Sequence, residues 1–208
     1  MPALYADTAR LERLIRELAP AYGPAGREEH VRALIRQHVE PLADEVSVDR
    51  MGNLIALVRG SGGPGARRVM IAAHMDEIGL MVTHIDDKGF LRFAPVGGHG
   101  VATLVGQRVV FEDGTCGIIG AEKLDDIKDL KLDRLFIDIG AADREDAARR
   151  VTVGSTAVFT RGVATSGSRL IGKAMDDRTG CAVLVELMHQ LRAHPSIHDV
   201  YCVFSVQE

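Results

Sequence analysis

The stretch from Val69 to Gly79 reads Val-Met-Ile-Ala-Ala-His-Met-Asp-Glu-Ile-Gly and decides the fold. Its first five residues, Val69 to Ala73, are apolar and predict a short buried strand, which His74 and Asp76 follow directly. Side chains two positions apart in an extended segment point the same way, so these two are expected on one side of the chain. Open α/β sheets bind ligands beyond the carboxyl ends of their strands, where this strand would place the pair.

A neutral imidazole is a common metal ligand, and a neighbouring carboxylate often fixes its tautomer. His74 and Asp76 are therefore a candidate metal ligand and its orienting partner. The alternative interpretation is a pair of polar loop residues at the end of a strand.

Two later stretches also place carboxylates at the ends of regular elements. Gly172-Lys173-Ala174-Met175-Asp176-Asp177-Arg178-Thr179-Gly180 precedes an apolar helical run, and the strand pattern from Val200 to Val206 ends in Gln207-Glu208. An Asp before a helix is most often a cap, which is the alternative interpretation of Asp176. Two adjacent carboxylates also repel each other, which favours a nearby cation, either Arg178 or a metal. His, Asp and Glu are the ligand set of hydrolytic zinc, cobalt or manganese sites.

With these three motifs in order, the chain resembles the dimetal aminopeptidases of the tetrahedral (TET) type, which are related to glutamyl and deblocking aminopeptidases. The matching residues are Ala73-His74-Met75-Asp76-Glu77-Ile78-Gly79, Gly172-Lys173-Ala174-Met175-Asp176-Asp177-Arg178 and Phe204-Ser205-Val206-Gln207-Glu208. The resemblance covers essentially the whole chain. In the family the third motif continues into a second glutamate, and an aspartate and a histidine ligand lie well beyond it. We therefore expect this chain to be the N-terminal portion of such an enzyme, or a relative that has lost the activity.

The expected elements form an α/β unit interrupted by an all-β insertion. Helices are expected around residues 11–18, 28–40, 144–150 and 179–191, the first of them capped by Asp7 or Thr8, and strands at 46–49, 54–58, 69–73, 80–85, 91–94, 107–111, 115–119, 135–139, 157–160, 170–171 and 200–206. The short strands between residues 80 and 160 predict a small β-barrel or sandwich. The resemblance implies a phosphorylase/hydrolase-like three-layer α/β/α catalytic domain, residues 1–76 and 166–208, interrupted by an oligomerisation β-barrel, residues 77–165.

Composition narrows the class of protein. A net charge of −4 and a pI near 6.1 give no electrostatic reason to expect nucleic acid or a membrane surface as partner. The three cysteines, Cys116, Cys181 and Cys202, are widely spaced, which argues against a disulfide framework and fits a reducing compartment. The N-terminal sequence carries no secretory signal, and no apolar run is long enough to span a membrane. We therefore predict a cytoplasmic protein with neither nucleic-acid nor membrane partners.

The resemblance implies a role for four residues. His74 would hold one metal ion, and Asp76 would orient His74 and raise its basicity. Asp176 would bridge two metal ions, and in the family the peptide bond after this aspartate is cis. Glu208 would be the general base that takes a proton from the attacking water and later hands it to the leaving amine.

These expectations describe a metal-dependent aminopeptidase that removes N-terminal residues from peptides and uses two divalent ions, zinc or cobalt, in each complete site. Of the family's five metal-ligand residues the chain supplies His74 and Asp176, so alone it is expected to bind metal weakly and to be inactive. A homo-oligomer is expected, a dimer that in relatives assembles further into dodecamers. His99, after Gly97-Gly98, is either a turn residue or a group that faces the substrate.

Two other functions stay open. A non-catalytic assembly or regulatory protein would keep the inserted β-domain as its dimerisation surface, and a metal content near zero would favour it. A related dimetal deacylase acting on N-acyl amino acids would share the metal ions but would lack the β-barrel.

Overall fold

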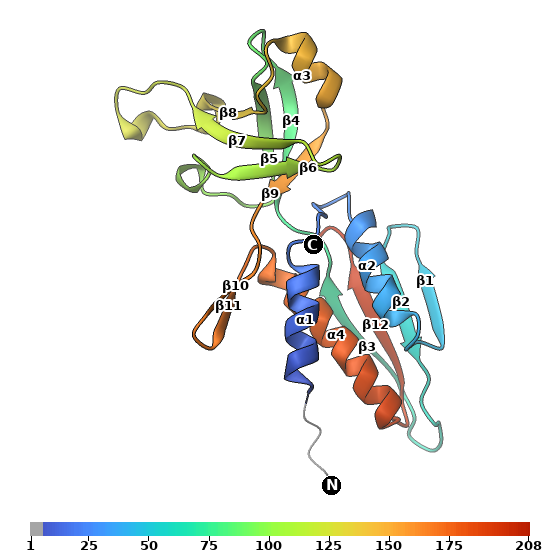
Figure 1. The fold of residues 1–208 in the computed structure, drawn as a ribbon. Coiled ribbons are helices and arrows are strands. Elements are labelled where there is room, and N and C mark those ends of the chain that lie inside the picture. The colour runs from blue at the N-terminus through green and yellow to red at the C-terminus, as the bar shows by residue number, and fades with distance from the viewer. Residues whose placement is uncertain (1–5) are drawn as a thin grey trace. The chain divides into compact units, whose positions relative to one another are not determined.

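The computed structural model describes residues 6–208, which fold into two compact units (Figure 1). Unit 1 consists of Met1–Asp76 and Arg161–Glu208, and unit 2 of Glu77–Thr160. The sequence analysis placed the corresponding boundaries at residues 77 and 166. Among the described residues, no helix has the length and apolar character needed to cross a membrane. Unit 1 carries the four residues to which a role was assigned.

Unit 1 contains a four-stranded sheet in the order β1-β2-β12-β3. Its strands are β1 (Glu45–Val48), β2 (Leu54–Val58), β3 (Arg68–His74) and β12 (Asp199–Ser205). β12 runs antiparallel to β2 and parallel to β3, with Ser205 opposite His74. The carboxyl ends of β3 and β12 therefore meet at one edge of the sheet, and the residues that follow the two strands come together there.

Three helices accompany this sheet. α2 (Glu29–Val39) and α4 (Met175–Ala193) pack against the strands, and α1 (Thr8–Leu18) packs against α4. The cap predicted for the first helix is confirmed at Asp7, whose carboxylate accepts the backbone N–H of Arg10 at 3.0 Å. The helix predicted around residues 28–40 is confirmed as α2.

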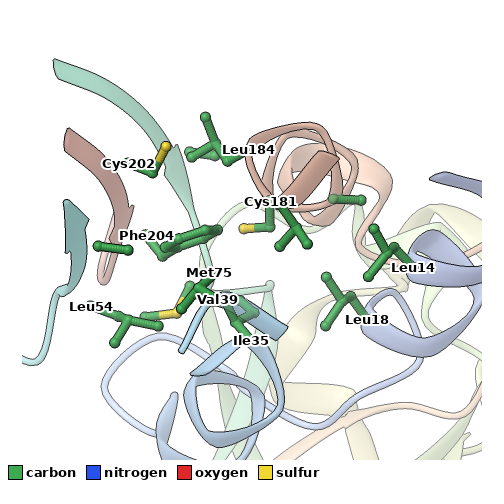
Figure 2. Packing of buried hydrophobic residues seen from close by; sticks show 14 of the residues in the cluster. Leu14, Leu18, Ile35, Val39, Leu54, Met75, Cys181, Leu184, Cys202 and Phe204 are labelled. Carbon is green, nitrogen blue, oxygen red and sulfur yellow. The ribbon is translucent and has the colours of Figure 1, made fainter. Parts of the chain in front are cut away.

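The helices and the sheet share one apolar core (Figure 2). Figure 2 shows side chains from α1, α2 and α4 meeting those of β2 and β12, and its labelled residues are Leu14, Leu18, Ile35, Val39, Leu54, Met75, Cys181, Leu184, Cys202 and Phe204. Along β12 every second residue is buried, which is the pattern of a sheet with one face on the core. Within residues 6–208 unit 1 thus has two layers, and the third layer implied by the resemblance is not seen there.

The strand predicted at residues 69–73 is present as β3, but the prediction that it is buried is wrong. Met70 is 71% exposed and Ile71 is 38% exposed, whereas Ala73 is buried. β3 lies at the end of the sheet order, so among the described residues it has a neighbouring strand on one side only. The apolar run therefore predicted the presence of the strand correctly, but it did not predict how far the strand is buried.

Unit 2 is a closed six-stranded barrel in the order β4-β5-β8-β7-β6-β9. The strands are β4 (Gly79–Ile85), β5 (Leu91–Val96), β6 (Arg108–Phe111), β7 (Cys116–Ala121), β8 (Leu135–Asp138) and β9 (Thr156–Phe159). Closure pairs every strand on both sides, so of the two architectures expected here the barrel is the one formed. Its interior is a second apolar core, separate from that of unit 1.

Short elements complete the two units. In unit 2 the helix predicted at residues 144–150 is confirmed as α3 (Arg144–Arg150), and three single 3-10 turns cover Val101–Thr103, Ile127–Asp129 and Leu132–Arg134. In unit 1 a two-stranded hairpin joins β10 (Ala164–Ser166) to β11 (Arg169–Ile171). The sequence predicted β11 but missed β10, because Ala-Thr-Ser carries no apolar alternation.

Candidate active site

His74 is the last residue of β3, and its imidazole lies among three carboxylates. Its Nδ1 is 3.2 Å from Oδ1 of Asp76. Its Nε2 is 3.3 Å from Oδ1 of Asp176 and 3.5 Å from Oε2 of Glu208. The structure thus brings together all four residues that the sequence analysis singled out.

The strand pairing explains how Glu208 reaches this place. Because β12 is parallel to β3 and Ser205 lies opposite His74, the residues that follow β12 run beside those that follow β3. The backbone N–H of Glu208 donates to Oδ1 of Asp76 at 3.2 Å, the same oxygen that faces His74. Asp76 is largely buried, so it forms a fixed link between the imidazole and the backbone of Glu208.

Asp176 reaches the imidazole from the start of α4, where Asp176 and Asp177 have non-helical backbone angles. The peptide bond between them is cis, as the resemblance implied. Oδ1 of Asp177 accepts the backbone N–H of Gly180 at 2.9 Å, so Asp177 caps the regular part of the helix. A Cβ at Gly180 would lie 2.2 Å from that oxygen, which explains the glycine. Since Asp177 makes the cap, the exposed carboxylate of Asp176 is available for His74.

The side chain of Arg178 anchors the start of α4 to the rest of unit 1. It is fully buried and donates to the backbone carbonyl of Met75, between His74 and Asp76. It also donates to the carbonyls of Leu18 at 2.6 Å and Ala21 at 3.0 Å. The sequence offered Arg178 as a counter-charge for the aspartates or as a structural residue, and these carbonyl contacts are structural. These contacts hold the turn that carries Asp176 against the segment that carries His74 and Asp76.

The electrostatics of the site favour a cation beside His74. Burial lowers the pKa of His74, but its hydrogen bond with Asp176 and the charges of Asp76 and Glu208 outweigh burial, so the pKa is raised. A carboxylate only accepts hydrogen bonds, so Asp76 places a ring proton on Nδ1 and leaves the lone pair of Nε2 facing two further acceptors. Three facing acceptors repel one another unless a proton or a metal ion lies between them.

The donor atoms fit a hydrolytic metal ion in their chemistry, because one imidazole nitrogen and two carboxylate oxygens are ligands of zinc and cobalt. A zinc site usually takes at least three protein ligands. In residues 6–208 no group of three or more His, Cys, Asp and Glu side chains is arranged to hold a metal ion. His74 and Asp176 are two donors of the right chemistry, fewer than such a site requires.

His99 lies in unit 2, in the loop after β5. Its Nε2 lies 2.9 Å from the backbone carbonyl of Gly79, and its ring meets Phe159 edge to face at 5.4 Å between centroids. These contacts match the turn interpretation. A contact between His99 and substrate stays a prediction.

Comparison with known proteins agrees with the fold and the motifs. The chain is 36% identical to the lysyl aminopeptidase of Pyrococcus furiosus in an alignment that covers 94% of this chain and 58% of that protein. Aminopeptidase APDkam598 from the archaeon Desulfurococcus kamchatkensis superposes with a TM-score of 0.88 at 40% identity, covering 96% of this chain and 56% of that chain. The Pyrococcus horikoshii TET1 peptidase, which can assemble into a tetrahedron or a large octahedral shell, superposes with a TM-score of 0.84 at 34% identity over 95% and 61% of the two chains.

An α/β unit interrupted by a closed barrel is therefore the fold that this chain shares with these aminopeptidases and peptidases. The chain belongs to the M42 glutamyl aminopeptidase family, whose sequence pattern matches residues 52–208. It spans somewhat more than half the length of the relatives it matches.

Proposed function

We propose that this chain carries part of the active site of a metal-dependent aminopeptidase, which removes N-terminal residues from peptides. The observation that carries the proposal is the convergence of Asp176 and Glu208 on Nε2 of His74, whose other ring nitrogen is held by Asp76. Membership of a family of aminopeptidases supports the reaction class.

His74 and Asp176 are the residues that would hold metal, with zinc or cobalt expected and two divalent ions in each complete site. Such ions, when bound, polarise the scissile carbonyl and lower the pKa of the attacking water. Asp76 accepts a hydrogen bond from Nδ1–H of His74, which would leave the Nε2 lone pair available to a metal ion. The family resemblance assigns Asp176 the bridging position, and its exposed carboxylate would be accessible to metal ions there.

Glu208 is the proposed general base. Its carboxylate is exposed, lies beside His74 Nε2, and is carried on a backbone whose N–H is fixed by Asp76. From there it would take the proton from the attacking water and later give it to the amine that leaves.

The closed barrel favours an aminopeptidase over the related deacylase, which would lack this insertion. The barrel would also provide the expected dimerisation element, and a homo-oligomer is part of the proposal because the similar TET1 peptidase can assemble into a tetrahedron or a large octahedral shell. A third layer over the second face of the sheet is proposed as well, since Met70 leaves a large apolar side chain exposed there.

The test uses the protein purified from its natural source. Zinc and cobalt content is measured by mass spectrometry, together with release of the first residue from a peptide with a free N-terminus. About two ions per chain and N-terminal release are expected. Glu208→Gln should keep the metal content and lower kcat by about 100-fold or more. Glu40→Gln, at an exposed ion pair remote from the site, is the control.

Two outcomes would overturn the proposal. A metal content near zero without peptide hydrolysis would mean that the protein is an assembly module. Hydrolysis of N-acylated amino acids without any action on free N-terminal peptides would mean that it is a deacylase.

A further inference from the structure

The turn between β1 and β2 is organised by one carboxylate. Oδ1 of Asp49 accepts the backbone N–H groups of Met51 at 2.9 Å and of Gly52 and Asn53 at 3.0 Å. Its second oxygen, Oδ2, accepts the side-chain amide of Asn53 at 2.8 Å. These hydrogen bonds, that from the Asn53 side chain foremost, hold the pKa of Asp49 below its usual range, so the carboxylate stays ionised.

The other end of the Asn53 amide reaches the segment that carries Glu208. Oδ1 of Asn53 accepts the backbone N–H of Val206 at 2.9 Å, one residue after β12 ends. Gln207 follows with a φ of 52°, a left-handed conformation in which the chain turns before Glu208. The N–H of Glu208 then donates to Asp76 at 3.2 Å. Two side-chain acceptors thus hold the backbone on both sides of the turn at Gln207.

The orientation of the Asn53 amide is determined by its neighbours. The carboxylate of Asp49 only accepts hydrogen bonds, so it requires the NH₂ group on its side. The backbone N–H of Val206 only donates, so it requires the oxygen. An amide turned the other way would face a like group at both ends, and both hydrogen bonds would be lost.

We propose that Asn53, oriented by Asp49, is a positioning residue for Glu208. Asn53 acts through the backbone of Val206, and it would set where the carboxylate of Glu208 stands relative to His74. The inference rests on the proposed role of Glu208 as general base. A displacement of about 1 Å in a reacting group can lower a rate about 100-fold, so loss of this anchor should lower kcat and leave KM and metal content nearly unchanged.

The test exchanges the two side chains. In Asn53→Asp a carboxylate would face the Asp49 carboxylate across 2.8 Å, and in Asp49→Asn two NH₂ groups would face each other. In the double variant Asp49→Asn/Asn53→Asp every contact is restored. The new amide at position 49 offers its oxygen to the three backbone N–H groups and its NH₂ group to position 53. The new carboxylate at position 53 accepts from that group and from Val206.

Four quantities are measured in the protein from its natural source. These are kcat and KM for a peptide with a free N-terminus, the metal content, and the hydrogen exchange of the Val206 amide. Each single variant should lower kcat by about 100-fold and speed Val206 exchange, and the double variant should recover kcat to within about threefold. Asp113→Asn is the matched control, because Asp113 organises a comparable turn in unit 2 by accepting from the N–H and the hydroxyl of Thr115, both at 2.9 Å.

The outcomes separate this inference from the proposed function. If Glu208→Gln abolishes turnover but Asn53→Asp keeps the normal kcat, Asn53 does not position the base and the proposed function stands. If both single variants lose metal and stability and the double variant recovers neither, the turn has a structural role only. If the double variant regains slow Val206 exchange without regaining kcat, the positioning role is refuted. If the unmodified protein does not hydrolyse peptides, the proposed function fails first and this inference fails with it.

Discussion

The ion pair between Glu186 and Arg10 contributes to the free energy of unfolding of unit 1 by an amount that can be calculated. The Glu186 side chain is 5% exposed and joins α4 to α1. It accepts from Nε of Arg10 at 2.6 Å, Nη2 of Arg10 at 3.1 Å, the backbone N–H of Asp7 at 3.0 Å and the side chain of Gln190 at 2.7 Å. These donors, Arg10 foremost, lower the pKa of Glu186 from an ordinary value of 4.5 to about 2. Glu186→Gln should therefore destabilise unit 1.

The pKa difference sets the magnitude. A shift from 4.5 to about 2 corresponds to a contribution of about 3 kcal/mol at neutral pH. Arg10 is 28% exposed and regains some hydration when its partner is neutral, so a loss of about 2 to 3 kcal/mol is expected. The folded-state pKa is depressed, so the contribution is complete above pH 4.5 and is lost as the pH falls towards 2. The unmodified and Glu186→Gln proteins should thus differ at pH 7 and converge in acid.

Urea unfolding followed by tyrosine fluorescence measures this. The chain has no tryptophan, and its three tyrosines, Tyr5, Tyr22 and Tyr201, all fall within the ranges of unit 1, so the signal reports that unit alone. Glu40→Gln is the matched control, because the pair of Arg36 and Glu40 is exposed and should contribute less than about 0.5 kcal/mol. The contribution assigned to the ion pair would be wrong if both variants lost the same free energy of unfolding at pH 7. It would also be wrong if Glu186→Gln and the unmodified protein still differed in stability at pH 2.

Four further substitutions should have defined effects. Arg178→Met removes the buried charged donor that the carbonyls of Met75, Leu18 and Ala21 share, and it should lower the unfolding free energy of unit 1 by about 3 kcal/mol or more, measured by the same urea titration. Gly180→Ala introduces a Cβ where Oδ1 of Asp177 now lies, so the cap must move, and the loss should be about 1 to 2 kcal/mol in that titration. His74→Ala should abolish zinc binding measured by calorimetry, whereas Asp76→Asn should weaken it by about 10- to 100-fold, because the partner of the ligand has changed and the ligand has not.

Each of these changes has its own comparison. Gly98→Ala in unit 2 adds a methyl group with no neighbour within 4 Å, so it should leave stability unchanged where Gly180→Ala does not. Arg178→Lys keeps the charge but cannot donate in a planar fork to carbonyls on different segments, so it should recover only part of the loss. Equal zinc affinity for Asp76→Asn and the unmodified protein would remove Asp76 from the proposed site.

Local patterns in the sequence predicted local structure well. The N-cap at Asp7, the helix Arg144–Arg150 and the barrel strands all follow from the spacing of apolar, acidic and glycine residues within a few positions. The convergence of His74, Asp76, Asp176 and Glu208 was expected through a resemblance between motifs, and the residue pattern alone left Asp176 open as a helix cap. The structure decides this, because Asp177 makes the cap.

Long-range pairing could not be obtained from the same patterns. The sequence pattern of a strand is the same whether the strand lies inside a sheet or at its end. The apolar run from Val69 to Ala73 therefore predicted burial, although Met70 is exposed. Short strands between glycine-rich turns fit a sandwich as well as a barrel, and only their pairing around a closed circle separates the two. β10 was missed because a hairpin strand with exposed side chains carries no apolar signal.

Arg178 and Asn53, which the structure links to the site, share one property that prevented their recognition in the sequence. Arg178 donates to the backbone carbonyls of Met75 and Leu18, and Asn53 accepts from the backbone N–H of Val206, and contacts with backbone leave no residue-type signature in a sequence. His74 was recognised as a candidate ligand because that chemistry needs particular residue types, a carboxylate two residues on and two later motifs that also carry carboxylates. A side chain that binds backbone needs only the right place, which is defined once the fold brings residues 53 and 206 together. The groups that would carry out the chemistry are therefore visible in this sequence, and the groups that aim them become visible in the structure.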